Sequence, residues 1–183
     1  MNIWDMKYRT KTYLAGDWTG DRAAIQMLQK WNEDDNRALN FVDVHSYTSS
    51  SDESLKCSIK RSLRQRMSIS KTFVLVVGDH TKNLRSGACY TCPFYNNWYG
   101  NESCEKGNSI DNRSYVQFEC DLAKDANINI VVLYNSTNVD KNKCPESLQH
   151  VGVHLPMFII SQDCYGNLSS KPNYQAIKNA INK

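Results

Sequence analysis

Residues 72–77 read Thr-Phe-Val-Leu-Val-Val, and this run decides the fold class of the chain. Every side chain in it is apolar or β-branched, and the run has the length of a strand rather than of a helix. A strand without alternation of polar and apolar residues is covered on both faces, as in the centre of a parallel sheet. The sequence therefore predicts a central strand with other elements packed against both of its sides.

Strand and helix patterns alternate on either side of this central run. Short β-branched or aromatic runs predict further strands at residues 11–15, 39–44, 129–134 and 155–160, the last at an edge of the sheet. Apolar residues at helical spacing predict helices at residues 22–34, after a capping box at residues 50–53, around Glu119, and at residues 173–182. Asp21 is placed to cap the first of these helices.

Strands separated by helices require right-handed crossovers and hence a parallel sheet. The sequence thus predicts an α/β fold of three layers, flavodoxin-like, with five parallel strands in the order 2-1-3-4-5 and helices on both faces. One domain spans residues 1–183, with its core at about residues 10–165. Residues 79–112 form a long insert with little periodicity, and long loops of this kind often serve as lids or binding surfaces.

Composition excludes several classes of protein. The net charge of +3 is too small to indicate a nucleic-acid partner. No apolar run reaches the length of a membrane span, and the first residues lack the apolar core of a signal peptide, so we expect no membrane and a cytoplasmic location. Five cations share one predicted helix and form either a solvated face or a site for a phosphate or a partner: Lys56, Lys60, Arg61, Arg64 and Arg66.

Seven cysteines make an odd count, and without a secretory signal they indicate reduced thiols. We predict no metal site. The alternative is a zinc site of four thiolates, formed by Cys89 and Cys92 at C-x-x-C spacing together with Cys104 and Cys120.

Residues 113–123 read Arg-Ser-Tyr-Val-Gln-Phe-Glu-Cys-Asp-Leu-Ala and put one acidic residue among apolar neighbours. Tyr115, Glu119 and Leu122 follow helical spacing, so they share one side of the predicted helix. A carboxylate on a buried face is costly unless it has a partner or a function. The alternative is a residue at the rim whose carboxylate reaches solvent or pairs with Arg113.

Ligands of parallel α/β sheets bind beyond the carboxyl ends of the strands. The predicted ends carry polar or stacking side chains, which we expect to bind substrate together with Tyr115 beside Glu119: Asp17, Trp18, Asp43, His45, Ser46 and Asp79. The chain contains none of the patterns GxGxxG, GxxxxGK[ST], HExxH and GxSxG, so a standard phosphate loop, a zinc protease and a serine hydrolase have little support.

Three segments together resemble the TIR-like proteins of bacterial antiphage systems, and in particular the TIR-like subunit of Thoeris defence. They are residues 13–18 (YLAGDW), 73–78 (FVLVVG) and 114–122 (SYVQFECDL). The resemblance implies a TIR fold and an enzyme that cleaves NAD at the nicotinamide–ribose bond, with Glu119 as the catalytic residue. It implies a signal, a cyclic or otherwise modified ADP-ribose, that activates a separate effector protein. It also implies a phage-derived trigger and a homo-oligomer, with no cofactor beyond the substrate NAD.

A lone carboxylate is chemically sufficient for this reaction. Glycosidases usually need two carboxyl groups because the leaving alkoxide must be protonated. Nicotinamide leaves NAD as a neutral base, so one carboxylate that offsets the developing positive charge is enough. Two rival functions stay open: residues 13–16 also resemble the first strand of nucleoside deoxyribosyltransferases, and the fold could act as a non-catalytic assembly module.

Overall fold

The computed structural model describes residues 11–34, 39, 41–42 and 55–183, and a parallel sheet forms its centre. The neighbouring strands of this sheet are, in order, β2 (Phe41–Val42), β1 (Lys11–Ala15), β3 (Ser70–Val77), β6 (Asn129–Tyr134) and β7 (Val153–Pro156). Every pairing between them is parallel. Numbered by their place in the chain among the strands of this sheet, they run 2-1-3-4-5, and the predicted α/β class with a parallel sheet is confirmed.

The central strand β3 supplies side chains to two separate cores, one on each face of the sheet. Phe73, Leu75 and Val77 belong to one apolar cluster, whereas Val74 and Val76 belong to the other. Alternating side chains of a strand point to opposite faces, and here both faces are covered. The unbroken apolar run of residues 72–77 therefore has the role that the sequence predicts.

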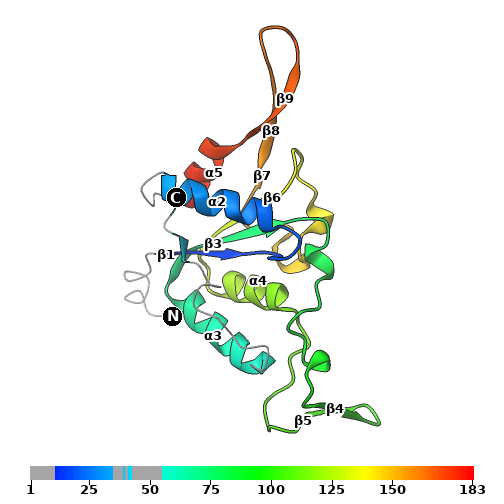
Figure 1. Cartoon of the computed structure of the whole chain (residues 1–183). Coiled ribbons are helices and arrows are strands. Elements are labelled where there is room, and N and C mark those ends of the chain that lie inside the picture. The colour runs from blue at the N-terminus through cyan, green and yellow to red at the C-terminus, as the bar shows by residue number, and fades with distance from the viewer. Residues whose placement is uncertain (1–10, 35–38, 40, 43–54) are drawn as a thin grey trace.

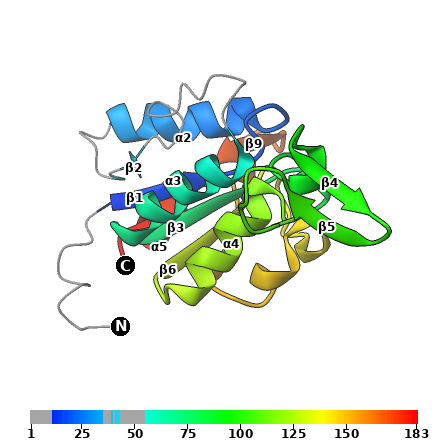
Figure 2. The same cartoon turned by 90° about the horizontal axis from the view of Figure 1, so that it is seen from below.

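Helices of the described residues cover both faces of the sheet (Figures 1 and 2). Helices α3 (Lys56–Ser68) and α4 (Tyr115–Asp125) pack on one face, where Leu63 and Phe118 join the cluster of Phe73. Helices α2 (Arg22–Asp34) and α5 (Tyr174–Ile181) pack on the opposite face. Each predicted helix is thus present, although the predicted capping box at residues 50–53 lies outside the described residues.

The last helix is tied to the amino ends of two sheet strands by hydrogen bonds as well as by apolar packing. The hydroxyl of Thr72 donates to the carbonyl oxygen of Ile181 at 3.2 Å. The amide of Asn129 donates to the carbonyl oxygen of Ala180 at 2.9 Å. These contacts satisfy carbonyl groups that a helix end would otherwise leave without partners.

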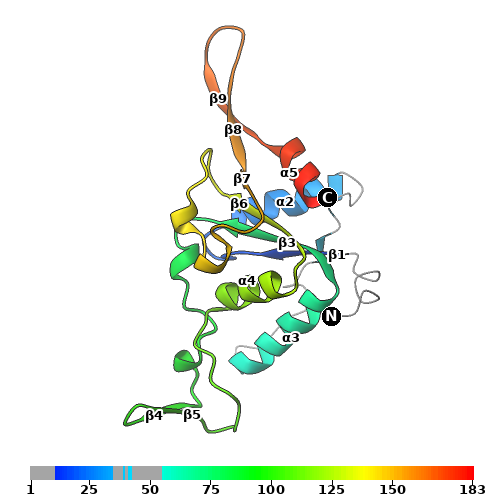
Figure 3. The ribbon, with the colours of Figure 1, turned by 180° about the vertical axis from the view of Figure 1, so that it is seen from behind.

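Two antiparallel hairpins lie outside the sheet and project from opposite sides of the molecule (Figure 3). One joins β4 (Tyr95–Trp98) to β5 (Asn101–Cys104) within the insert, and the other joins β8 (Phe158–Gln162) to β9 (Leu168–Pro172). The chain therefore has more strands than the sequence predicts.

The predicted edge strand at residues 155–160 is wrong in its extent, because two strands share these residues. β7 ends at Pro156, and Met157 between β7 and β8 is fully buried. β8 then leaves the sheet to pair with β9. A proline cannot donate a ladder hydrogen bond, which suits the end of an edge strand. Within the described part of the chain, no helix is both long and apolar enough to cross a membrane.

Candidate functional site

Glu119 lies on α4, the helix that follows the insert. Its amino end is capped by Ser114, whose hydroxyl accepts a hydrogen bond from the backbone N–H of Gln117 at 3.1 Å. The residues of α4 at helical spacing then bury one face, and Glu119 is on it with only 5% of its surface exposed. The predicted position of this carboxylate on a buried helix face is what the structure shows.

The partner of Glu119 is Tyr13 of β1. The tyrosine hydroxyl donates to Oε1 of Glu119 at 2.6 Å, and both side chains are buried. Burial raises the pKa of Glu119 to about 7, while the Tyr13 hydrogen bond and the positive charge of Arg66 act in the opposite direction. Burial and the neighbouring carboxylate raise the pKa of Tyr13 well above its usual value, so Tyr13 acts as a neutral donor.

The alternative role of Glu119 as a rim residue is wrong. Arg113 instead forms ion pairs with Asp111 at 2.7 Å and with Asp121 at 2.8 Å. A buried carboxyl group whose pKa lies near 7 can gain or lose its proton at physiological pH. Such groups occur at active sites more often than elsewhere. The same feature also occurs in structural pairs, so it identifies a candidate.

A cavity of about 340 Å³ lies at the carboxyl edge of the sheet. Its lining includes Asp17 after β1 and Asp79 after β3, so the structure brings these two predicted residues together. Asp79 forms an ion pair with Lys143 at 2.6 Å; the Asp79 side chain is largely exposed and that of Lys143 is partly exposed. Glu119 is not among the lining residues, so the structure does not bring it together with Asp17 and Asp79.

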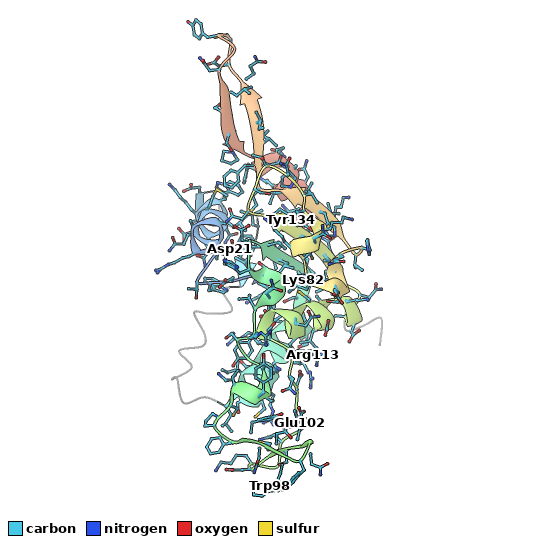
Figure 4. All side chains as sticks on the ribbon, turned by 90° about the vertical axis from the view of Figure 1, so that its right-hand side faces the viewer. Asp21, Lys82, Trp98, Glu102, Arg113 and Tyr134 are labelled. Atoms are coloured by element: carbon cyan, nitrogen blue, oxygen red, sulfur yellow. The ribbon has the colours of Figure 1, made fainter. Side chains whose placement is uncertain are left out.

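Asp21, which the sequence predicts only as a helix cap, is a buried acid in the lining of this cavity. Asp21 is 5% exposed and accepts a hydrogen bond from the amide of Asn135 at 3.0 Å. Burial raises the pKa of its carboxyl group. Figure 4 shows Asp21 on the side of the sheet edge near Tyr134, which also lines the cavity. Gly78 makes this approach possible, because a Cβ there would stand 2.1 Å from Oδ1 of Asp21. Asn135 directly follows β6, so the rule of strand ends could have identified it.

Of the remaining predicted substrate-binding residues, the described ones, Trp18 and Tyr115, do not line the edge cavity. Trp18 packs against the apolar cluster of the α2 face and does not line the edge cavity. Tyr115 is half-buried against Gly87, and its hydroxyl finds no hydrogen-bond partner among the described residues. Burial raises the pKa of Tyr115 to about 12. The predicted residues Asp43, His45 and Ser46 lie outside the described residues.

The predicted basic cluster divides into two kinds of residue. Lys60 is 4% exposed, forms an ion pair with Asp111 at 3.1 Å and donates to the carbonyl oxygen of Arg113 at 2.7 Å. Lys60 thus ties α3 to the end of the insert. Arg61 and Arg64 are exposed on the same helix, as a solvated face requires.

The alternative zinc set is not assembled as the sequence predicts. Cys120 is fully buried in the core between α4 and the sheet, whereas Cys89, Cys92 and Cys104 line a small pocket of the insert. All cysteines of the chain are free thiols. Across residues 11–34, 39, 41–42 and 55–183, no three His, Cys, Asp or Glu side chains are arranged so that they could hold a metal ion.

Comparison with known families gives one result. Residues 13–86, from β1 to the start of the insert, match the family model of the Thoeris protein ThsB, TIR-like domain. No curated protein matches the chain. The predicted resemblance to Thoeris TIR-like proteins is thereby confirmed, and the match supports a role of the TIR family in Thoeris antiphage defence. The matched residues include Tyr13 and end before Glu119.

Proposed function

We propose, from the similarity of residues 13–86 to the TIR-like domain of the Thoeris protein ThsB, that this protein cleaves NAD at the nicotinamide–ribose bond. The product is an ADP-ribose-derived, cyclic signal that activates a partner effector in antiphage defence. The observation that carries the proposal is the buried Glu119 carboxylate, which is held by Tyr13 and has a pKa of about 7.

The reaction requires a carboxylate in a fixed position next to the cation that forms on the ribose. Loss of neutral nicotinamide leaves positive charge on the ribose, and a preorganised anion in a water-poor site stabilises that charge. The Tyr13 hydroxyl fixes Oε1 of Glu119, which leaves Oε2 to face the sugar. Arg66 favours the ionised form of Glu119, which is the form that the reaction needs.

Three of the predicted nucleotide-binding residues follow β2 in the sequence and lie outside the described residues: Asp43, His45 and Ser46. Val42 of β2 pairs with Tyr13 of β1, and the chain continues from Val42 into Asp43. We therefore keep Asp43, His45 and Ser46 as proposed substrate-binding residues of the Glu119 site. Asp17 and Asp79 belong to the separate cavity at the sheet edge, where they are proposed to contact the distal part of the nucleotide.

The test is NAD turnover in cells that carry the protein, with and without phage infection, followed by chromatography of nicotinamide and ADP-ribose derivatives. Glu119→Gln keeps the shape of the side chain and removes its charge. We expect this variant to retain less than about a tenth of the cleavage, because electrostatic groups of this type contribute around 100-fold or more. Glu33→Gln, at an exposed glutamate of α2, is the matched control and should retain full activity.

A folded Glu119→Gln variant that cleaves NAD at the rate of the unmodified protein would exclude the proposed role of this residue. Folding is checked by circular dichroism. Turnover of deoxynucleosides instead of NAD would favour the deoxyribosyltransferase alternative.

One observation favours a second candidate, a non-catalytic module that assembles with partners. Glu119 is nearly inaccessible in the described structure, and Tyr13 already occupies one of its oxygen atoms. In this case the pair would be a structural element of the core. The module predicts that Glu119→Gln changes the free energy of unfolding but not the defence phenotype, whereas the enzyme loses the phenotype with the signal.

A further inference from the structure

Four of the seven cysteines meet around one small pocket of about 20 Å³. They come from segments far apart in the chain: Cys57 from the first turn of α3, Cys89 and Cys92 from the insert, and Cys104 from the end of β5. The other three cysteines are elsewhere, with Cys120 and Cys144 in the core and Cys164 exposed. Four sulfur atoms are the complete ligand set of a structural zinc site.

Two tight turns present the cysteines of the insert. Residues Cys89–Thr91 form a 3-10 turn, in which the N–H of Cys92 donates to the carbonyl oxygen of Cys89 at 2.8 Å. After β5, the N–H of Gly107 donates to the carbonyl oxygen of Cys104 at 2.8 Å, and Gly107 has a φ of +70°. Glycine adopts this conformation without a steric penalty. Each turn therefore holds a thiol at its start.

Backbone N–H groups point at two of the sulfur atoms. The N–H of Asp111 donates to Sγ of Cys89 at 3.2 Å, and the N–H groups of Lys106 and Asn108 donate to the sulfur of Cys104. Hydrogen bonds of this kind hold a sulfur atom in one position, as the donors around metal ligands do. This pattern of donors is of little use to inert buried thiols.

Nearby cations offset the charge that a metal site would carry. Four thiolates and Zn²⁺ together carry a charge of −2, which is unfavourable in a half-buried place without compensation. Lys56 lines the pocket, and Lys60 lines an adjacent pocket together with Cys57 and Cys89. Lys60 is itself buried and binds the end of the insert through Asp111.

The insert also needs a cross-link, because its hairpin has almost no apolar core. The strands β4 and β5 are mostly exposed; Trp98 at the end of β4 is 70% exposed, and Tyr99 in the turn that follows is 96% exposed. Figure 4 shows Trp98 and Glu102 at the far end of this projection. Small segments that cannot bury enough apolar surface are commonly stabilised by a metal or by disulfides.

We propose that Cys57, Cys89, Cys92 and Cys104 bind one structural zinc ion, which anchors the insert to α3. Cys57 thus takes the place that the sequence alone would give to Cys120. Binding exchanges four S–H bonds for four Zn–S bonds and releases four protons to solvent, with no change of oxidation state. In the described structure no three of these thiols are arranged to hold an ion, so the proposed binding requires their side chains to rotate about the Cα–Cβ bonds. This site is independent of the activity of Glu119.

The test is the zinc content of the full chain, purified anaerobically with a reductant and analysed by mass spectrometry of the elements. We expect about one zinc per chain, and a Co²⁺-substituted protein with the intense visible absorption of tetrahedral thiolate coordination. Cys57→Ser, Cys89→Ser, Cys92→Ser and Cys104→Ser should each lower zinc retention in the presence of a competing chelator. Cys120→Ser and the exposed-site control Cys164→Ser should retain the metal at the unmodified level.

Because some variants could fail to fold, the zinc content of the unmodified protein is sufficient to test the proposal. Less than about 0.2 zinc per chain after reconstitution of the reduced protein with Zn²⁺ would overturn the proposal. Disulfides among these four cysteines, found by alkylation without reduction of protein from aerobic cells, would overturn it as well. Zinc retained fully by Cys57→Ser but lost by Cys120→Ser would restore the set that the sequence suggests.

Discussion

The Glu119 carboxyl group shows what a single buried charge does to a core. Side chains around α4 and β1 surround it in place of water, and the hydroxyl of Tyr13 donates a hydrogen bond to it. Burial dominates and raises the pKa of Glu119 to about 7. The protonated form is thus favoured in the folded state relative to the unfolded state.

This shift makes the free energy of unfolding depend on pH in a direction that can be worked out. Between the usual pKa of 4.5 and the folded pKa of about 7, the folded protein binds more protons than the unfolded chain. Stability from this group is therefore complete below about pH 4.5 and is lost as the pH rises to about 7. The loss is on the order of 3 kcal/mol.

Glu119→Gln should remove this dependence, because an amide does not titrate. Urea unfolding of both proteins at several pH values measures the pH dependence of the difference between their unfolding free energies. We expect the variant to gain stability relative to the unmodified protein as the pH rises from 4.5 to 7. A difference that stays constant over this range would mean that the carboxyl group is not perturbed by burial.

At the scale of elements, α4 depends on its cap to position Glu119. Ser114→Ala removes the acceptor for the N–H of Gln117 and should lower the free energy of unfolding by about 1 kcal/mol. Denaturant unfolding measures the loss. Ser170→Ala, at an exposed serine of β9, is the control and should change stability by less than about 0.5 kcal/mol. Equal effects of the two substitutions would show that the cap is dispensable.

Sequence reasoning was most accurate for elements buried by the sheet itself. The predicted bounds of β1 and β6 agree with the structure, because short runs of β-branched, aromatic and other apolar residues mark strands buried in the sheet. It failed for the β4–β5 hairpin, whose residues are polar and mostly exposed. The available signal was Tyr99-Gly100, both with positive φ, in the two-residue turn that joins the strands.

In the candidate site, too, some features follow from local sequence patterns and others do not. The burial of Glu119 follows from helical spacing, and Asp17 and Asp79 follow from the ends of strands. The Tyr13–Glu119 hydrogen bond joins residues 106 positions apart in the chain. The meeting of Cys57 with Cys89, Cys92 and Cys104 likewise depends on where α3 lies against the insert. Such pairings require the three-dimensional path of the chain, which no local pattern contains.

At the scale of the whole molecule, the β8–β9 hairpin is an appendage rather than a part of the core. Every residue of β9 is exposed, and Tyr165 and Leu168 are 87% and 70% exposed. At its base, the N–H of Asn173 donates to the carbonyl oxygen of Met157 at 2.8 Å. The two ends of the hairpin thus lie close enough for a short turn to join them.

Replacement of residues 159–171 by Asn-Gly should therefore change the free energy of unfolding by less than about 1 kcal/mol, since little apolar surface leaves the core. Thermal and urea unfolding of the shortened protein measure the effect. Met157→Ala, at a fully buried side chain beside the same base, should instead cost about 2–5 kcal/mol. A shortened protein that unfolds as readily as the Met157 variant would show that the hairpin stabilises the sheet.

The attachment of α5 to Thr72 and Asn129 has a consequence for how the protein is made. The apolar side chains of β3 and β6 on that face, such as Val74 and Val131, are covered in part by Ile177 and Ile181. During synthesis these isoleucines follow all strands of the sheet. The nascent sheet therefore exposes apolar side chains on this face until residues 174–181 leave the ribosome. Translation that stalls shortly before this point should yield chains that chaperones bind.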